Sequence, residues 1–174
     1  MKASITILLC LMLLTPARFA AAAADINFSG KLVETPCVLD PKDGQIDIDV
    51  GSVIDKYLYS HQRSPGTPFA IHLLNCDLSL GKEVTIKFWG TSDELQPDFL
   101  KLFKGGAQGV AVGIETSENV FIPLFENIDF IGLQPGENII NLKVFVSAEK
   151  NAIAQKKIMP GAIETVADFF IEYQ

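Results

Sequence analysis

Histidine, cysteine and tryptophan are scarce in this chain of 174 residues, which has two histidines, three cysteines and one tryptophan. His61 and His72 are isolated from each other, and neither lies at ligand spacing from a cysteine. Metal centres are usually built from three or four histidine, cysteine or carboxylate ligands. The sequence therefore predicts no metal and no cofactor, and it disfavours an enzyme such as a copper or zinc oxidoreductase.

Basic residues are also few, with 14 lysines and arginines against 21 aspartates and glutamates. Removal of a leader that contains Lys2 and Arg18 leaves 12 basic against 21 acidic side chains, a net charge of −9. Nucleic acids and anionic membranes are bound by basic surfaces. We expect neither as a partner, and no motif points to a small-molecule substrate.

The N-terminus has the layout of a secretory signal peptide. Lys2 precedes an apolar run over residues 5–14, which is too short to span a membrane and is followed by a string of small residues. The small-residue rule allows cleavage at several points between residues 17 and 24, and we assign residues 1–22 to the signal peptide. Cys10 lies inside the apolar run after two leucines, which argues against a lipoprotein.

The remainder, residues 23–174, is long enough for one domain with one core. Cys37 and Cys76 survive processing and would enter an oxidising compartment, where a disulfide forms and persists. Closing a loop of this length stabilises a fold by about 4 kcal/mol on the chain-entropy model. We therefore predict a structural disulfide between these two cysteines.

Apolar residues alternate with polar ones in most of the chain, which is the pattern of half-buried β-strands. Gly- and Pro-containing turns separate these runs, and only residues 92–103 could hold a short turn of helix. Many short strands with regular turns predict an antiparallel β-sandwich. The alternating runs are 46–50, 69–73, 84–88, 110–114, 140–146 and 169–173.

Candidate catalytic residues are few. Asp47 and Asp49 lie on one face of a predicted strand and could in principle form a carboxylate pair. Their alternation with Ile46 and Ile48 is explained more simply by a solvated outer face. The sequence predicts that this protein is not an enzyme.

Several segments, taken in order, resemble the chaperone–usher pilins of type 1 and P fimbriae. The opening Phe-Ser-Gly-Lys-Leu-Val at 28–33, followed by Cys37, resembles the first pilin strand, and the run 69–76 resembles the strand that carries the second cysteine. The segments 49–51, 86–91 and 109–114 match further pilin segments. The most specific likeness is the C-terminus, where Gly161 is fourteenth from the end, Tyr173 is penultimate, and apolar residues alternate between them.

The resemblance implies an all-β fold, an incomplete immunoglobulin-like antiparallel β-sandwich that lacks its final strand. It implies a structural subunit of a fimbria that supports cell adhesion, exported through the periplasm to the cell surface. The implied partners are a periplasmic chaperone, an outer-membrane usher and neighbouring pilin subunits. The chaperone would lend a strand, and a neighbour's N-terminal extension would later replace it, a form of β-augmentation.

The resemblance also implies roles for residues near the C-terminus. Phe169, Ile171 and Tyr173 would form the apolar face of the strand beside the groove, with Gly161 at its start, and the chaperone's basic residues would hold the carboxylate of Gln174. In the alternative interpretation these side chains fill an ordinary complete core. Alternation alone does not separate the two.

One feature departs from polymerising pilins, which carry about ten or more residues ahead of the first strand. Cleavage after Ala22 leaves only five residues before Phe28, which is too short to cross a groove. Two alternatives therefore stay open beside an ordinary fimbrial subunit. One is a minor tip or assembly-terminating pilin without an effective donor strand, and the other is a self-complete secreted adhesive module.

Overall fold

A computed structural model describes residues 29, 32 and 34–173. The chain divides into two units, Met1–Val33 and Glu34–Gln174, and the fold described here belongs to the second. The predicted signal peptide, residues 1–22, lies outside the described residues, as does Gln174. No helix within the described part is long and apolar enough to cross a bilayer.

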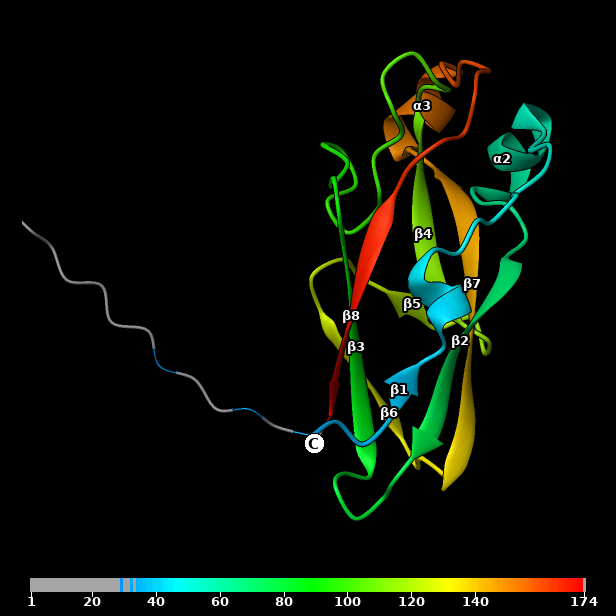
Figure 1. Cartoon of the computed structure of the whole chain (residues 1–174). Coiled ribbons are helices and arrows are strands. Elements are labelled where there is room, and N and C mark those ends of the chain that lie inside the picture. Colours follow the sequence, from blue (N-terminus) through cyan, green and yellow to red (C-terminus); the bar gives the residue numbers. More distant parts are fainter. Residues whose placement is uncertain (1–28, 30–31, 33, 174) are drawn as a thin grey trace, which may run out of the picture. The chain divides into compact units, whose positions relative to one another are not determined.

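The first layer is a sheet of five strands in the order β1-β2-β7-β4-β5 (Figure 1). Every neighbouring pair in it is antiparallel. The long strands β2 and β7 form its centre, where Phe69 pairs with Leu142 and Ile71 with Ile140. Its strands are β1 (Val38–Leu39), β2 (Thr67–Cys76), β7 (Gly136–Ala148), β4 (Val110–Thr116) and β5 (Phe121–Ile122).

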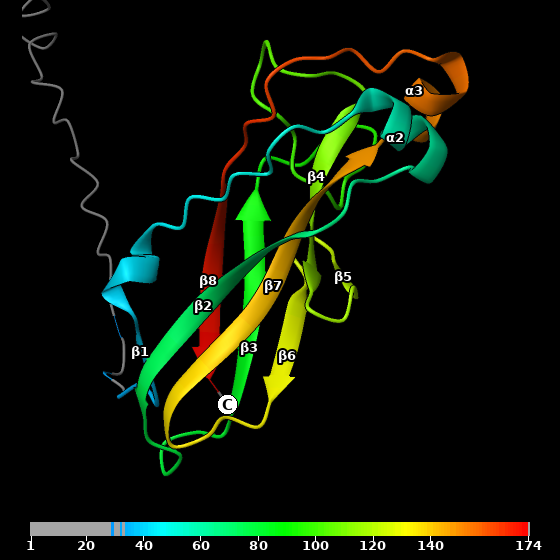
Figure 2. The same cartoon turned by 90° about the vertical axis from the view of Figure 1, so that its right-hand side faces the viewer.

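The second layer is an antiparallel sheet of three strands in the order β6-β3-β8. These strands are β6 (Asn127–Ile131), β3 (Glu83–Gly90) and β8 (Ala167–Tyr173). Figure 2 looks onto the five-stranded sheet, with β3 and β8 behind β2 and β7. The predicted antiparallel β-sandwich is confirmed.

The core lies between the two sheets and is built from the alternating residues that point inward. Ile71 and Leu73 of β2 and Ile86 of β3 are fully buried, as is Val146 of β7. Full burial of such a side chain contributes about 1.5–3 kcal/mol relative to exposure. Alternation therefore fixes which face of each strand packs inward, because a one-residue shift in register would expose the whole set.

The predicted disulfide is present, and it joins Cys37 to Cys76. It ties the residue before β1 to the last residue of β2, next to the pair Val38 and Leu74. Both cysteines are buried in the core. The disulfide therefore holds the start of the described domain against the five-stranded sheet.

Three short helices interrupt the strands in the described part of the chain: the 3-10 helix η1 (Pro41–Gly44), α2 (Asp55–His61) and α3 (Lys150–Gln155). Neither α2 nor α3 was expected from the sequence, because one or two turns cannot display a helical stripe. The suggested helical turn at 92–103 is wrong. That stretch forms no helix and is an irregular loop of bends, isolated bridges and one hydrogen-bonded turn, in which the Phe99 N–H donates to the Gln96 carbonyl at 2.9 Å.

The run 46–50 was expected to be a strand, and the structure differs in one respect. Its apolar side chains are half-buried and alternate with exposed Asp47 and Asp49, as the pattern predicts. The segment nevertheless belongs to neither sheet. Alternation shows which face is covered, but it does not show whether a partner strand supplies hydrogen bonds.

Candidate functional site

One edge of the three-stranded sheet is open. Within the described part of the chain, β8 pairs with β3 on one side and with no strand on the other. Phe169, Ile171 and Tyr173 point inward and remain half-buried, whereas their neighbours on β3 are almost completely buried. The apolar face of the sheet is therefore covered at β3 and uncovered at β8.

The segment 45–53 forms the opposite wall. Its residues Ile46, Ile48, Val50 and Val53 pack against the core and are only half-buried. No backbone group of this segment bonds to the backbone of another described residue. In Figure 1 it is the cyan stretch that leads from η1 to α2. Two apolar walls with unpaired backbone thus border one groove.

Polar contacts hold the end of β8 and the start of the wall segment to the rest of the domain. At one end the Tyr173 hydroxyl oxygen lies 3.5 Å from the carbonyl oxygen of Cys37, which is a long contact for a hydrogen bond. Partial burial of the Tyr173 side chain raises the pKa of its hydroxyl, because burial disfavours the phenolate. The wall segment is fixed near this end by His72, whose Nδ1 lies 2.9 Å from Oδ2 of buried Asp43 in η1.

A hollow of about 240 Å³ lies between the end of the wall segment at Val53 and the chain that leads into β8. Its lining is mostly apolar and comes from the wall segment, α2, β4 and the chain before β8. Val53 and Leu58 meet Gly161 and Ile163 there.

Gly161 is required by a close approach between two backbone segments. A Cβ at this position would lie 2.6 Å from the nitrogen of Ala107 and 2.7 Å from the carbonyl carbon of Gly106. The Ala107 N–H donates to the carbonyl of Ala162 at 2.8 Å, and Gln108 and Met159 exchange two bonds of 3.0 Å. These bonds hold the chain that leads into β8 against the loop before β4.

The chain matches the model of a family described as "Fimbrial protein" over residues 26–174. It belongs to the fimbrial protein family.

Relatives support this assignment over most of their length. The fimbrial chain is 29% identical over 161 residues to the fimbrial adapter PapK of Escherichia coli, covering 88% of this chain and 90% of PapK. It is 27% identical over 149 residues to the Fimbria A protein of Serratia marcescens, covering 86% and 83% of the two chains. The P pilus rod subunit PapA has the same fold, with a TM-score of 0.68, 23% identity, and coverage of 80% of this chain and 100% of PapA.

Family membership makes this fimbrial protein a structural, non-enzymatic subunit. The carboxylates of Asp47 and Asp49 are exposed, and one oxygen of Asp49 accepts from the backbone N–H of Gly51 at 2.8 Å. His61 stacks on Tyr57, with ring centroids 4.0 Å apart, away from His72 in β2. No group of three or more possible metal ligands occurs among the residues that the structure describes.

The sequence assigned Phe169, Ile171, Tyr173 and Gly161 to contacts with a chaperone or a donated strand. In this fimbrial fold the first three are half-buried side chains of β8, whereas Gly161 lies in the chain before β8 and lines the hollow of about 240 Å³. The proposed role of Gln174 lies outside the described residues. The segment 45–53 was not recognised as the second wall. Its alternation was visible, but the absence of a partner strand depends on tertiary structure.

Proposed function

We propose that this fimbrial protein is a subunit of a chaperone–usher fimbria that completes its fold by accepting a β-strand from another molecule. The observation that supports this best is the groove between β8 and the segment 45–53. Both walls carry half-buried apolar side chains and unpaired backbone groups. An exposed apolar edge of this kind promotes uncontrolled pairing unless another chain covers it.

A strand that entered the groove would pair with β8 and add a fourth strand to the β6-β3-β8 sheet. Its alternate side chains would cover Phe169, Ile171 and Tyr173, and one would reach the hollow beside Gly161. If four or five apolar side chains enter, their burial amounts to about 6–15 kcal/mol before ordering costs. Interactions of that size keep subunits together without a covalent bond.

The proposed sequence of partners begins with export. Residues 1–22 are removed as a signal peptide, and residues 23–174 form a single pilin domain. A periplasmic chaperone first fills the groove and holds the carboxylate of Gln174, and the usher then passes the subunit to a neighbouring pilin. The fimbria on the cell surface supports adhesion. N-terminal sequencing of the protein recovered from fimbriae tests the cleavage site directly.

Co-expression with and without the chaperone tests the proposal. We expect degradation or aggregation of the subunit when the chaperone is absent, because the groove then stays uncovered. Soluble monomer that unfolds cooperatively without any partner would contradict the proposal and would favour a self-complete secreted module.

A pair of neighbouring substitutions on β8 tests the groove itself. Ile171→Lys places a charge on the inward face, whereas Glu172→Lys places the same side chain on the exposed face. We expect Ile171→Lys to abolish recovery of the chaperone complex and Glu172→Lys to preserve it. Equal recovery of both complexes would show that no strand binds along the inward face of β8.

A further inference from the structure

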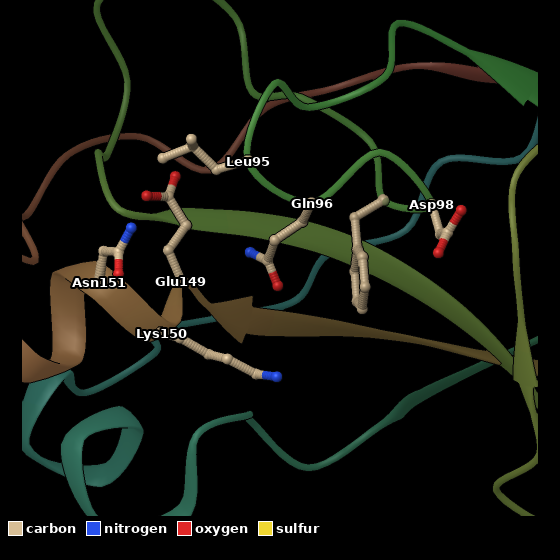
Figure 3. A pocket seen from close by; sticks show the side chains of 7 residues that line it. Leu95, Gln96, Asp98, Glu149, Lys150 and Asn151 are labelled. Carbon is tan, nitrogen blue, oxygen red and sulfur yellow. The ribbon is translucent and has the colours of Figure 1, made fainter.

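A second hollow, of about 380 Å³, lies where the loop Leu95–Phe99 faces the residues 149–151 at the start of α3 (Figure 3). The amide nitrogen of Gln96 is buried there without a partner among the described residues, and it has almost no surface that a ligand could contact. The exposed rim mixes carboxylates with the ammonium group of Lys150, so it favours no one class of ligand. The outer face of the β6-β3-β8 sheet is more selective.

Three aromatic rings lie in a row on this outer face. The ring of Trp89 in β3 meets the ring of Phe125 edge-on, with centroids 5.8 Å apart, and it meets the ring of Phe170 in β8 at 5.6 Å. About half of each side chain is exposed, at 48% for Trp89, 45% for Phe125 and 50% for Phe170. Together they expose roughly 200–400 Å² of apolar surface. A patch of that size is among the largest on an ordinary monomer and is often functional.

The row ends at the open edge of the sheet. Phe170 lies on β8, and Trp89 is its only ring partner among the described residues. A strand that pairs with β8 puts its outward side chains beside those of β8, with opposite Cβ atoms about 4.5–5.5 Å apart. One outward side chain of that strand would therefore lie against Phe170 and extend the row by one position.

Carboxylates flank Phe170 along the outward face of β8. Asp168 and Glu172 alternate with the inward residues, and both are exposed. Neither carboxylate makes a hydrogen bond or an ion pair with another described residue. Lys87 of β3 pairs with Phe170 on the same face, but it forms no ion pair with either carboxylate. The edge beside Phe170 thus presents two unpaired negative charges.

The opposite wall of the groove carries the same charge. In the segment 45–53 the side chains of Asp47 and Asp49 are exposed, because they alternate with the residues that pack on the core. Their hydrogen bonds come from neutral groups, the Gln45 amide at 3.2 Å and the Gly51 N–H at 2.8 Å. A strand in the groove would therefore have carboxylates on both sides of its outer face.

We infer that the strand accepted by β8 is also recognised on its outer face, through an aromatic side chain opposite Phe170 and a basic side chain at the next outward position on either side. The inference rests on the proposed function, because it concerns the same groove. The aromatic side chain extends the row of rings, and the basic side chains pair with Asp168 and Glu172. The order basic, aromatic, basic reads the same in both directions, so it applies to a strand of either polarity.

A second copy of this chain does not offer such a strand. Residues 23–30 contain Asp25 as their only charged residue. If Ile26 and Phe28 entered the groove, Asp25 would face outward, because alternate residues of a strand share a face. It would then meet carboxylates on both sides. The partner is therefore a different protein, whose docking strand has basic residues on its outer face.

Competition between designed peptides tests the inference on the full mature chain in its purified chaperone complex. Two peptides long enough to span β8 share inward valine and isoleucine residues and differ outward, one with Lys-Phe-Lys and the other with Glu-Phe-Glu. They are offered together at equal concentration, and mass spectrometry gives the ratio in which they replace the chaperone. We expect the basic peptide to be favoured about tenfold at low salt, because two cross-strand pairs change from attraction to repulsion, and less in about 1 M NaCl.

Variants of β8 locate the effect. Asp168→Lys should bring the ratio close to one, because one of the two flanking charges is reversed. Glu118→Lys makes the same change at an exposed site in the turn after β4 and should leave the ratio at about tenfold. A third peptide with Lys-Ser-Lys should be taken up about threefold less than Lys-Phe-Lys by the wild type, and as readily by Phe170→Ser.

The outcomes separate this inference from the proposed function. If none of the peptides with apolar inward residues replaces the chaperone, the groove does not accept a strand, and the proposed function and the inference both fail. If the Lys-Phe-Lys and Glu-Phe-Glu peptides are taken up equally, or if Asp168→Lys and Glu118→Lys give the same ratio, the inference alone is overturned. A preference for the acidic peptide would also overturn it and would favour an acidic donor, such as a second copy of this chain.

Discussion

Replacement of Gly161 by alanine should destabilise the subunit through a backbone collision. The new Cβ would stand 2.6 Å from the Ala107 nitrogen, 0.8 Å closer than an ordinary contact of 3.4 Å. Since Gly161 has no positive φ, the collision alone causes the effect. Overpacking of this kind costs about 1–3 kcal/mol. If the chain around residue 161 moves away to relieve the collision, it also strains the three backbone hydrogen bonds that join it to the loop before β4, each worth about 1 kcal/mol. We expect a total loss of about 2–4 kcal/mol.

Pulse proteolysis in urea measures this loss in the chaperone complex, because it reports the unfolded fraction of one chain in the presence of another. With an m-value of about 2 kcal/mol/M, the midpoint should fall by about 1–2 M. Gly44→Ala is the matched control, since nothing lies within 4 Å of its Cβ position and its φ is not positive. Its stability should change by about 1 kcal/mol or less. If Gly161→Ala and Gly44→Ala unfold at the same midpoint, the close approach does not constrain the fold.

The remaining predictions concern the disulfide, a buried charge and pH. Replacing Cys37 and Cys76 together by serine should lower the free energy of unfolding by about 4 kcal/mol, because the disulfide closes a loop of 39 residues and so restricts the unfolded chain. An unchanged urea midpoint would exclude this contribution. Arg63→Met removes the guanidinium group that lies 3.6 Å from the centroid of the Phe145 ring, and it leaves the fully buried carboxylate of Glu115 without its partner at 2.7 Å. We expect this change to lower the free energy of unfolding by about 2–3 kcal/mol. The control Glu118→Gln, at an exposed site, should cause no loss. Because burial raises the pKa of Glu149, folding favours its neutral form, so this carboxyl group lowers stability as pH rises through its folded-state pKa. Glu149→Gln should therefore raise the melting temperature at pH 7 and leave it unchanged near pH 3, and equal shifts at both pH values would argue against an ionisation effect.

Most strands could be predicted from alternation, because β2, β3, β7 and β8 are more deeply buried on one face than on the other; β4 is buried on both faces, and its alternation is one of large and small side chains. Alternation reports burial, however, and the run at 46–50 shows the same pattern without a partner strand. The helices α2 and α3 were missed because six or seven residues are too few for a stripe.

The candidate sites were predictable to different degrees. The likeness to pilins pointed to Gly161, but only the structure gives the reason, which is the approach of the Gly106 and Ala107 backbone. The hollow at Gln96 and Glu149 had no signal in the sequence. Its lining comes from two groups of residues, 95–99 and 149–151, which are fifty or more positions apart and meet only because the loop before β4 lies against the end of β7.

The pairing of β8 with β3 also sets when the chain can fold. Val84 pairs with Tyr173, which is 89 positions later in the sequence, so the three-stranded sheet is complete only when both segments are available. Contacts between residues so distant in sequence form slowly and leave apolar strands exposed in the meantime. The inward side chains of β3, among them Val84, Ile86 and Phe88, therefore lack the cover of β8 until residues 167–173 have been made, and that interval is the time of greatest aggregation risk.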